Sequence, residues 1–201
     1  MSAELRASLL LPAPEAAPAL LGCTLTHTTA EGNVRVEITE VEAYAGALDP
    51  ASHAYRGPTA RNAAMFGPPG FAYVYFSYGM HWCLNVVTGP AGTPSAVLIR
   101  AGRVLEGEEL ARSRRGPATR ERALARGPAC LTQALGIDRT SAGLDLLAGE
   151  AGLTLARAGR PRELTWSAGP RVGVSAASDV AWRFWLTGDP TVSAYRRSPR
   201  A

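Results

Sequence analysis

Apolar and polar residues alternate along the chain from Asn33 onward. Val34, Val36 and Ile38 share one side of an extended chain, and the polar residues between them share the other. A period of two predicts a strand with one buried face. If this strand continues without a bulge, its core-facing side also carries Glu40, Glu42 and Tyr44.

A second pattern, between residues 71 and 87, predicts a β-hairpin. Two runs of aromatic and β-branched residues flank Ser77–Met80, and Gly79 can supply the positive φ that a tight turn needs. Residues 46–70, which precede the hairpin, are rich in Gly, Pro, Ala and Asn. They are too long for a plain connector, which makes them a candidate site loop.

The rest of the chain predicts short elements of both kinds. Helices are expected at residues 16–21, 106–115, 120–126 and 128–135. Strands are expected at residues 96–101, 153–157, 163–166, 171–175 and 183–187. The pattern as a whole predicts a single-domain α+β fold with a mostly antiparallel sheet and a protruding hairpin.

Length and composition agree with one domain. A chain of 201 residues with 46% hydrophobic content can bury one substantial core, and no shift in composition divides it. The apolar run Leu9–Leu11 is interrupted by Pro12, Pro14 and Glu15, well before a signal sequence or membrane span is complete. We therefore expect a cytoplasmic protein with no membrane contact.

Cysteine and histidine spacing predicts neither a disulfide framework nor a metal site. The cysteines are odd in number, lie far apart and form no CxxC pair; they are Cys23, Cys83 and Cys130. We expect them to be small buried apolar residues. The histidines, which lack metal-ligand spacing, are His27, His53 and His81. We expect no metal and no cofactor.

Every basic side chain is arginine. The chain has 21 Lys plus Arg, all of them Arg, against 17 Asp plus Glu, which gives a net charge of +4. This balance is compatible with a coding bias on an ordinary solvated surface, and a solvated helical face is the usual reading of the Arg-rich stretch 112–126. It is equally compatible with a polyanionic partner, because Arg binds phosphate bidentately. The absence of lysine argues against a lyase, which uses a lysine amine to form a Schiff base.

Glu40 and Glu42 are the candidate chemical groups of the strand. Carboxylates on an apolar face are costly to bury unless they are paired or hydrogen-bonded. They therefore favour a functional site, unless the strand end is exposed or each carboxylate pairs with an arginine such as Arg100.

Tyrosines cluster in the same part of the sequence. Tyr44, Tyr73 and Tyr75 are compatible with plain hairpin core, but Tyr78 sits at the predicted turn, where a large aromatic side chain has little to pack against. An exposed apolar hairpin tip often marks a partner contact, and such a side chain can wedge into a DNA step.

Several motifs in order give the chain a family resemblance. These motifs are Glu40–Tyr44, His53, Gly57–Phe66, Gly70–Met80, Cys83–Asn85, Val97–Ala101, Gly127–Pro128, Leu131 with Ala134–Leu135, and Arg171–Val174. With their near-constant spacing they resemble the alkyladenine (3-methyladenine) DNA glycosylases. The resemblance covers nearly all of the chain after about residue 17, so it implies an N-terminal tail of residues 1–16 and a glycosylase domain of residues 17–201.

The resemblance implies a role for each matching position. Glu42 would be the general base that deprotonates the attacking water, held by Arg100 and the backbone carbonyl of Val172. The walls of the base pocket would be Tyr44, His53 and Tyr75, with Asn85 disfavouring a purine 2-amino group. At the hairpin tip, Tyr78 would fill the gap left by the flipped nucleotide, with Met80 nearby.

The implied activity is that of a monofunctional glycosylase. It would flip an alkylated or deaminated purine out of double-stranded DNA and hydrolyse its N-glycosidic bond during base excision repair. The purines of this class are 3-methyladenine, hypoxanthine and ethenoadenine. A monomer associated with the nucleoid is expected. The segment 53–59, His81–Trp82 and Cys130 depart from the family pattern, which leaves the preferred purine open.

Two other classes of protein compete with this interpretation. A non-catalytic nucleic-acid-binding module would have no reason to keep a carboxylate at position 42 where a phosphate must pass. A free-nucleoside hydrolase would have no need of Tyr78.

Overall fold

The computed structural model describes residues 2–77, 79–158 and 163–201. Its α-helices are α1 (Ser2–Leu9), α2 (Ala13–Ala16), α3 (Glu108–Arg115) and α4 (Pro128–Leu135). Its strands are β1 (Thr24–Thr29), β2 (Gly32–Tyr44), β3 (Ala72–Ser77), β4 (His81–Val87), β5 (Ala96–Glu106), β6 (Leu153–Ala156), β7 (Trp166–Gly169) and β8 (Arg183–Leu186). Short 3₁₀ helices span Ala17–Leu20, Gly46–Leu48, Ala63–Phe66, Glu121–Ala123, Arg139–Ser141 and Glu150–Gly152.

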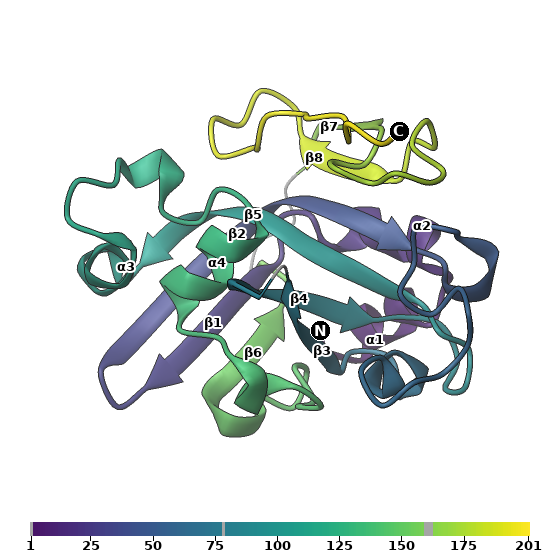
Figure 1. The fold of residues 1–201 in the computed structure, drawn as a ribbon. Coiled ribbons are helices and arrows are strands. Elements are labelled where there is room, and N and C mark those ends of the chain that lie inside the picture. The colour runs from purple at the N-terminus through teal and green to yellow at the C-terminus, as the bar shows by residue number, and fades with distance from the viewer. Residues whose placement is uncertain (1, 78, 159–162) are drawn as a thin grey trace.

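Within the described residues the strands form one antiparallel eight-stranded sheet. The main path runs β3-β4-β5-β2-β1-β6, and β8 pairs with both β2 and β7. Figure 1 shows β2 and β5 crossing the centre of the molecule, with α3 and α4 at one end and α1 and α2 at the other. The predicted single-domain α+β architecture with a mostly antiparallel sheet is therefore confirmed.

The predicted hairpin is present and is formed by β3 and β4. Their register runs from Ala72 opposite Val86 to Ser77 opposite His81. Gly79 in the connecting turn has φ of 65°, the left-handed conformation expected for it. Tyr78, the expected wedge, lies outside the described residues.

Strand β2 is longer than a typical strand because it has two successive partners on one edge. Residues 32–37 pair with β1, and residues 40–42 pair with β8, while β5 follows the opposite edge. The register with β5 shifts between Ile38 and Glu40 and again between Glu40 and Val41. Such an irregularity changes the face to which the following side chains point.

The expectation that the glutamates share the face of Val34, Val36 and Ile38 is therefore wrong. After the irregularity, Val41 and Ala43 join those residues in the main hydrophobic cluster. Side chains alternate along a strand, so Glu40 and Glu42 lie on the opposite face. The uninterrupted strand on which the expectation rested is not what the chain forms.

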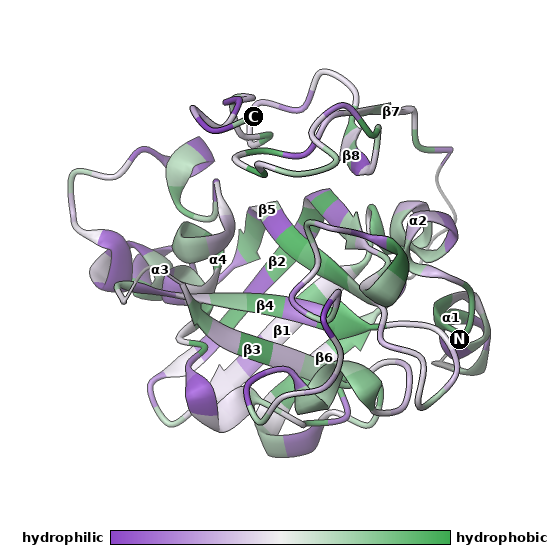
Figure 2. Ribbon diagram, turned by 45° about the vertical axis from the view of Figure 1, so that its right-hand side comes forward, coloured by the Kyte–Doolittle hydropathy of each residue, from purple (hydrophilic) through white to green (hydrophobic). Residues whose placement is uncertain are grey.

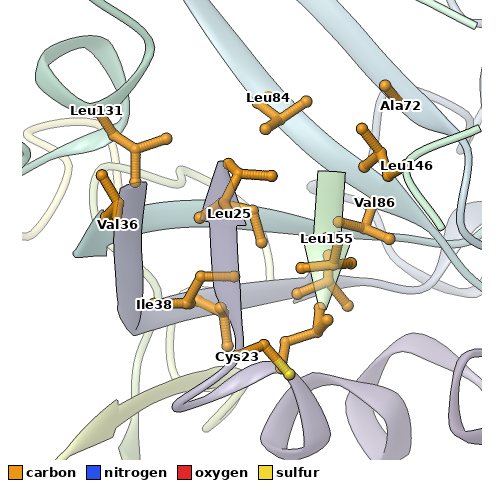
Figure 3. Packing of buried hydrophobic residues seen from close by; sticks show 14 of the residues in the cluster. Cys23, Leu25, Val36, Ile38, Ala72, Leu84, Val86, Leu131, Leu146 and Leu155 are labelled. Carbon is orange, nitrogen blue, oxygen red and sulfur yellow. The ribbon is translucent and has the colours of Figure 1, made fainter. Parts of the chain in front are cut away.

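The main core lies between one face of the sheet and the helices. Figure 3 shows Leu25, Val36 and Ile38 from the first two strands in one cluster with Leu131 of α4 and Leu155 of β6. The hydrophobic colour in Figure 2 is concentrated in the central strands, and α3 is largely hydrophilic. Of the cysteines, Cys23 and Cys83 are buried as expected, and Cys130 is partly exposed.

Residues 2–16, expected to be a tail, instead form α1 and α2. Leu5 and Leu9 are fully buried in the main cluster. The main chain is also tied to the sheet region, because Gly89 donates its N–H to the carbonyl of Leu9 at 2.8 Å. These helices therefore belong to the packed domain.

The predicted helices at 106–115 and 128–135 are confirmed as α3 and α4. Two arginines of the basic stretch join these helices to their surroundings, since Arg114 donates to the carbonyl of Ala134 and Arg115 to that of Leu124. Of the other two predicted helices, the one at 16–21 is the 3₁₀ helix Ala17–Leu20, and the one at 120–126 is only the 3₁₀ turn Glu121–Ala123. The segment after this turn lies against the sheet, because the N–H of Gly102 in β5 donates to the carbonyl of Ala125 at 3.0 Å.

Two of the predicted strands are wrong or misplaced. Residues 163–165 are irregular, and β7 begins only at Trp166. Residues 171–175 form a turn in which Gly173 has φ of 72° and its N–H donates to the carbonyl of Arg196. The side chain of Arg171 in this turn is buried.

No helix of the described residues is long and apolar enough to cross a membrane.

The packing of α1 gives a test of the domain boundary. Leu5→Ala should lower the free energy of unfolding by about 2–5 kcal/mol, the cost of truncating a buried leucine. Leu11→Ala is the matched control, because Leu11 is 44% exposed, and its effect should stay within about 0.5 kcal/mol. Urea unfolding measures both. Equal effects of the two variants would show that α1 is a dispensable tail.

Candidate active site

A cavity of about 530 Å³ opens on the sheet face opposite the main core. The strands supply it with alternate residues: Val74, Leu84 and Ile99 belong to the main cluster, and their neighbours face the cavity. Its lining from the strands consists of Tyr44, Tyr73, Tyr75, Ser77, Cys83, Asn85, Leu98 and Arg100. The rest of its lining consists of Pro50, Ala51, His53, Arg61 and Met65 of the segment 46–70, Pro128 at the start of α4, and Val172–Ser175.

The expected site loop closes one side of this cavity. A second, smaller hydrophobic cluster packs Ala54 and Met65 of the loop against Tyr73 of β3. Asn62 fastens the loop to itself, since its amide nitrogen donates to the carbonyls of His53 and Gly57 at 2.9 and 3.0 Å. The loop is therefore held in place both by its internal hydrogen bonds and by the packing of its apolar residues on β3.

Aromatic side chains form the wall between the loop and the hairpin. The ring centroids of His53 and Tyr75 are 4.5 Å apart, with the rings nearly perpendicular. Nδ1 of His53 is 3.0 Å from the hydroxyl of Tyr73, and that bond fixes the orientation of the imidazole. The structure thus brings together the expected wall residues Tyr44, His53 and Tyr75 around one cavity.

Asn85 lies at the cavity wall on β4, where the resemblance expects it. It is 4% exposed, and its amide nitrogen donates to the carbonyl of Tyr73 at 3.0 Å. This bond sets which end of the amide faces the cavity. The orientation of Asn85 is therefore determined by the pairing of β3 with β4.

Glu42 is fully buried directly behind the cavity wall. Its Oε2 accepts a hydrogen bond from the Tyr44 hydroxyl at 2.8 Å, and its Oε1 accepts one from the Val172 N–H at 2.7 Å. Nη1 of Arg100 is 3.4 Å from Oε1. All three partners line the cavity, so the carboxylate is one side chain from its interior.

Glu40 is buried too, but its partners are different. Arg100 and Arg183 donate their Nε to its Oε1 at 3.0 and 2.7 Å. Ser193 closes the other side, with its N–H on Oε2 at 2.7 Å and its hydroxyl on Oε1 at 2.9 Å. Apart from Arg100 of β5, its partners lie in the C-terminal part of the chain and hold that part on the sheet.

Arg100 is the shared partner of the two carboxylates. Burial alone would lower its pKa, but the adjacent charges of Glu42 and Glu40 outweigh burial and raise it above the ordinary value. The alternative in which each glutamate pairs with Arg100 is thus realised in the geometry. It does not exclude a site, because Arg100 also lines the cavity.

Burial has opposite consequences for two ring side chains of the site. Burial and the neighbouring carboxylate of Glu42 raise the pKa of the Tyr44 phenol well above 10, so its hydroxyl keeps its proton and donates to Glu42. Burial and the charge of Arg61 lower the pKa of His53 below 6.5, which favours the neutral imidazole near neutral pH.

Val172 is placed at the site, but the atom that contacts Glu42 is its N–H. The role expected from the resemblance concerned its carbonyl.

Met80 lies apart from the cavity lining at the hairpin turn and is 65% exposed. On the same hairpin, the rings of Phe76 and Trp82 are in contact, with centroids 4.7 Å apart and planes tilted by 46°.

Sequence reasoning missed several residues that organise this site. Arg61 donates to the carbonyl of Phe76 and places its guanidinium 5.8 Å from the Tyr75 ring centroid. Arg171 and Asp49 form a fully buried ion pair beside Tyr44. Arg171 lies within a motif of the resemblance, but no local pattern distinguishes an inward-pointing arginine from a solvated one.

The described part of the chain contains no group of three or more His, Cys, Asp or Glu side chains that could hold a metal ion. The polar side chains that line the cavity or lie directly behind it carry a carboxylate, two guanidiniums, phenols, an imidazole, an amide, a thiol and hydroxyls.

Comparisons with known proteins agree on one family. The family model described as methylpurine-DNA glycosylase matches residues 8–190. A relative from Streptomyces avermitilis is 53% identical over 192 residues, which cover 94% of this chain and 90% of the relative. Relatives from Leifsonia xyli and Nocardia farcinica are 52% and 50% identical, with 96% of this chain covered in each case. All three carry the name 3-methyladenine DNA glycosylase.

The carboxylate network predicts an unequal response to charge removal. Glu40→Gln leaves two buried guanidiniums beside a neutral amide, so the free energy of unfolding should fall by about 3–5 kcal/mol, the cost of breaking a buried ion pair. Glu106→Gln removes the exposed pair with Arg35 and should cost about 0–1 kcal/mol. Chemical denaturation measures both, and a near-zero effect of Glu40→Gln would contradict the network.

His53 offers a direct test of the cavity electrostatics. NMR titration should give an imidazole pKa below 6.5, and Arg61→Gln should move it part of the way back. Because the folded pKa is the lower one, the unfolded chain takes up the proton first. This contribution to stability is full above pH 6.5 and declines as the pH falls through the folded pKa. A folded pKa at or above 6.5 would refute the assignment.

Proposed function

Because the chain belongs to the methylpurine-DNA glycosylase family, we propose that it hydrolyses the N-glycosidic bond of alkylated or deaminated purines in double-stranded DNA, as part of base excision repair. Its substrates under this proposal are 3-methyladenine, hypoxanthine and ethenoadenine. The observation that carries the proposal is the contrast between two buried carboxylates on one strand. Apart from Arg100, which contacts both carboxylates, the donors of Glu40 belong to the C-terminal part of the chain, whereas the partners of Glu42 line a cavity.

The cavity supports a role as a pocket for a flipped base. Its volume of about 530 Å³ lies within the roughly 300–1,000 Å³ that enclose small organic ligands. An enzyme that reacts with a base must take it out of the stack, and aromatic walls offset part of that cost. Tyr44, Tyr75 and His53 would supply these walls, and Asn85 would disfavour a purine 2-amino group, as in guanine.

Glu42 would act on the water that attacks the sugar. As a carboxylate it can accept the proton of that water while its charge stabilises the positive charge that builds on the sugar. The hydrogen bonds from Tyr44 and Val172 hold it in one orientation. Arg100 would help to hold the water, with the carbonyl of Val172 as a further acceptor.

The hairpin would fill the space that the flipped nucleotide leaves. Tyr78 at its turn would be the wedge, with the exposed Met80 nearby. The arginines would bind backbone phosphates, which gives salt-dependent affinity for damaged and undamaged duplex alike. Since the chain has no lysine to form an imine, the product would be an unbroken abasic strand. The enzyme would act as a monomer on nucleoid DNA in the cytoplasm.

A single-turnover assay tests this function and the assignment of Glu42 together. The protein should release the base from duplexes that carry hypoxanthine, ethenoadenine or 3-methyladenine. Glu42→Gln keeps the side-chain volume but removes the base and the charge. Excision should therefore fall by at least about 10²–10⁴-fold, the usual contribution of a positioned general base. Binding to a duplex with an abasic-site analogue should persist.

Glu40→Gln is the matched control, because it changes a buried glutamate of the same strand in the same way. At a temperature where both variants are folded, it should slow excision less than Glu42→Gln does. Normal excision by Glu42→Gln, or a greater loss with Glu40→Gln, would overturn the mechanism. Absence of base release from all three duplexes by the unchanged protein would overturn the function itself.

A further inference from the structure

Arg171 is the largest of the fully buried side chains, and nothing in the mechanism above uses it. Its guanidinium lies between the rings of Tyr44 and Trp182, 4.8 and 5.2 Å from their centroids. Its Nη1 donates to the carbonyl of Ala43 at 3.0 Å, in the strand that carries Glu42. The arginine thus contacts the end of β2 through both a hydrogen bond and a ring face.

Asp49 receives the other donors of this guanidinium. Its oxygens accept Nη1 at 2.5 Å and Nη2 at 2.9 Å, a bidentate pair in which both side chains are fully buried. The same carboxylate accepts the N–H groups of Ala45 and Ala51 at 3.3 and 3.0 Å. It therefore organises the turn that leads into the site loop, where Pro50 and Ala51 line the cavity.

Stability alone does not account for a pair of this kind. A buried ion pair loses hydration, and well-packed apolar residues of similar volume are often equally stabilising. Nε of Arg171 has no hydrogen-bond partner among the described residues, so the arginine is not even fully satisfied. The planar fork of an arginine can hold a carboxylate of one segment bidentately while it also donates to the backbone of another.

We propose that Arg171 and Asp49 are positioning residues, which hold the Val172 N–H on Glu42 and fix three walls of the cavity relative to one another. The inference rests on the proposed function for its catalytic consequence. Val172 follows Arg171 directly in the chain, and its N–H bond to Glu42 is 2.7 Å long. The pair joins this segment to the end of β2 and to the start of the site loop, segments 122 to 128 residues apart in sequence.

The test uses a neutral double variant, Arg171→Met with Asp49→Asn. Methionine can fill the space between the two rings, since sulfur packs well against aromatic side chains. Asparagine keeps an acceptor oxygen for the loop. Arg171→Lys is the second variant, because it keeps the charge but cannot make the bidentate contact and the Ala43 contact together.

Arg114→Met is the matched control. Arg114 is also mostly buried and bonded to a main-chain carbonyl, that of Ala134, but none of its partners lines the cavity. Arg114→Met should therefore lower the stability of the fold without displacing the residues that line the cavity. Thermal unfolding of all the variants identifies the temperature at which each is folded.

Two readouts separate positioning from general stability. Hydrogen exchange of the Val172 amide should be faster in the double variant than in Arg114→Met at matched stability. Single-turnover excision should fall by about 10²-fold, the order of loss for a small displacement at a reacting centre. Affinity for the abasic-site analogue should stay close to that of the control. Arg171→Lys should fall between the double variant and the unchanged protein in both readouts.

Amide exchange and excision that follow stability alone, with the double variant matching Arg114→Met, would overturn the proposal. The exchange readout needs no enzymatic activity, so it decides the positioning role even if none of the duplexes is a substrate. The proposed function fails separately, when the unchanged protein releases no base.

Discussion

The burial of Glu40, Arg100 and Glu42 in one contact network is the constraint on which the site depends. Two carboxylates cannot share a dry sheet face without a cation between them, because each would lose its hydration uncompensated. Arg100 supplies that cation from the neighbouring strand β5. Arg183 and Ser193 then satisfy Glu40 from the C-terminal segment, which is thereby held against β2. Glu42 is instead hydrogen-bonded to Tyr44 and Val172, which line the cavity.

The irregularity in β2 makes this network possible. Before it, the strand points Val34, Val36 and Ile38 into the main core, and after it Val41 and Ala43 take over that face. The irregularity occurs where the partner strand changes from β1 to β8. One long strand therefore serves both as the centre of the core and as the floor of the site, with the polar side chains turned away from the apolar cluster.

Part of the cavity wall comes from segments of the chain that have no regular secondary structure. The site loop is anchored by Asn62 and by apolar packing on β3, and the turn at 171–175 is held through Arg171. Irregular segments of this kind lack the repeating bonds of a helix or sheet. Their position depends on a few specific side-chain contacts, which makes those contacts candidates for functional sensitivity.

The sequence by itself determined several local elements and pointed to many of the residues that line the cavity. Alternation and turn residues were sufficient for the hairpin, for α3 and α4, and for a strand that carries Glu42. Family resemblance was sufficient to collect Tyr44, His53, Tyr75, Asn85 and Arg100, all of which line the cavity. These predictions share a cause, because periodicity and motifs are properties of residues that lie close together in the sequence.

Only the tertiary structure decided which face the glutamates occupy and which of them is saturated with donors. The deciding partners lie far away in sequence: Ser193 is 153 residues from Glu40, and Arg171 is 122 residues from Asp49. Local pattern likewise gives no sign that Leu5 and Leu9, in the segment expected to be a tail, are buried in a cluster whose other members mostly follow much later in the sequence. A local pattern predicts the secondary structure of one segment. Whether a buried charge is compensated depends on the partners that the rest of the fold places next to it.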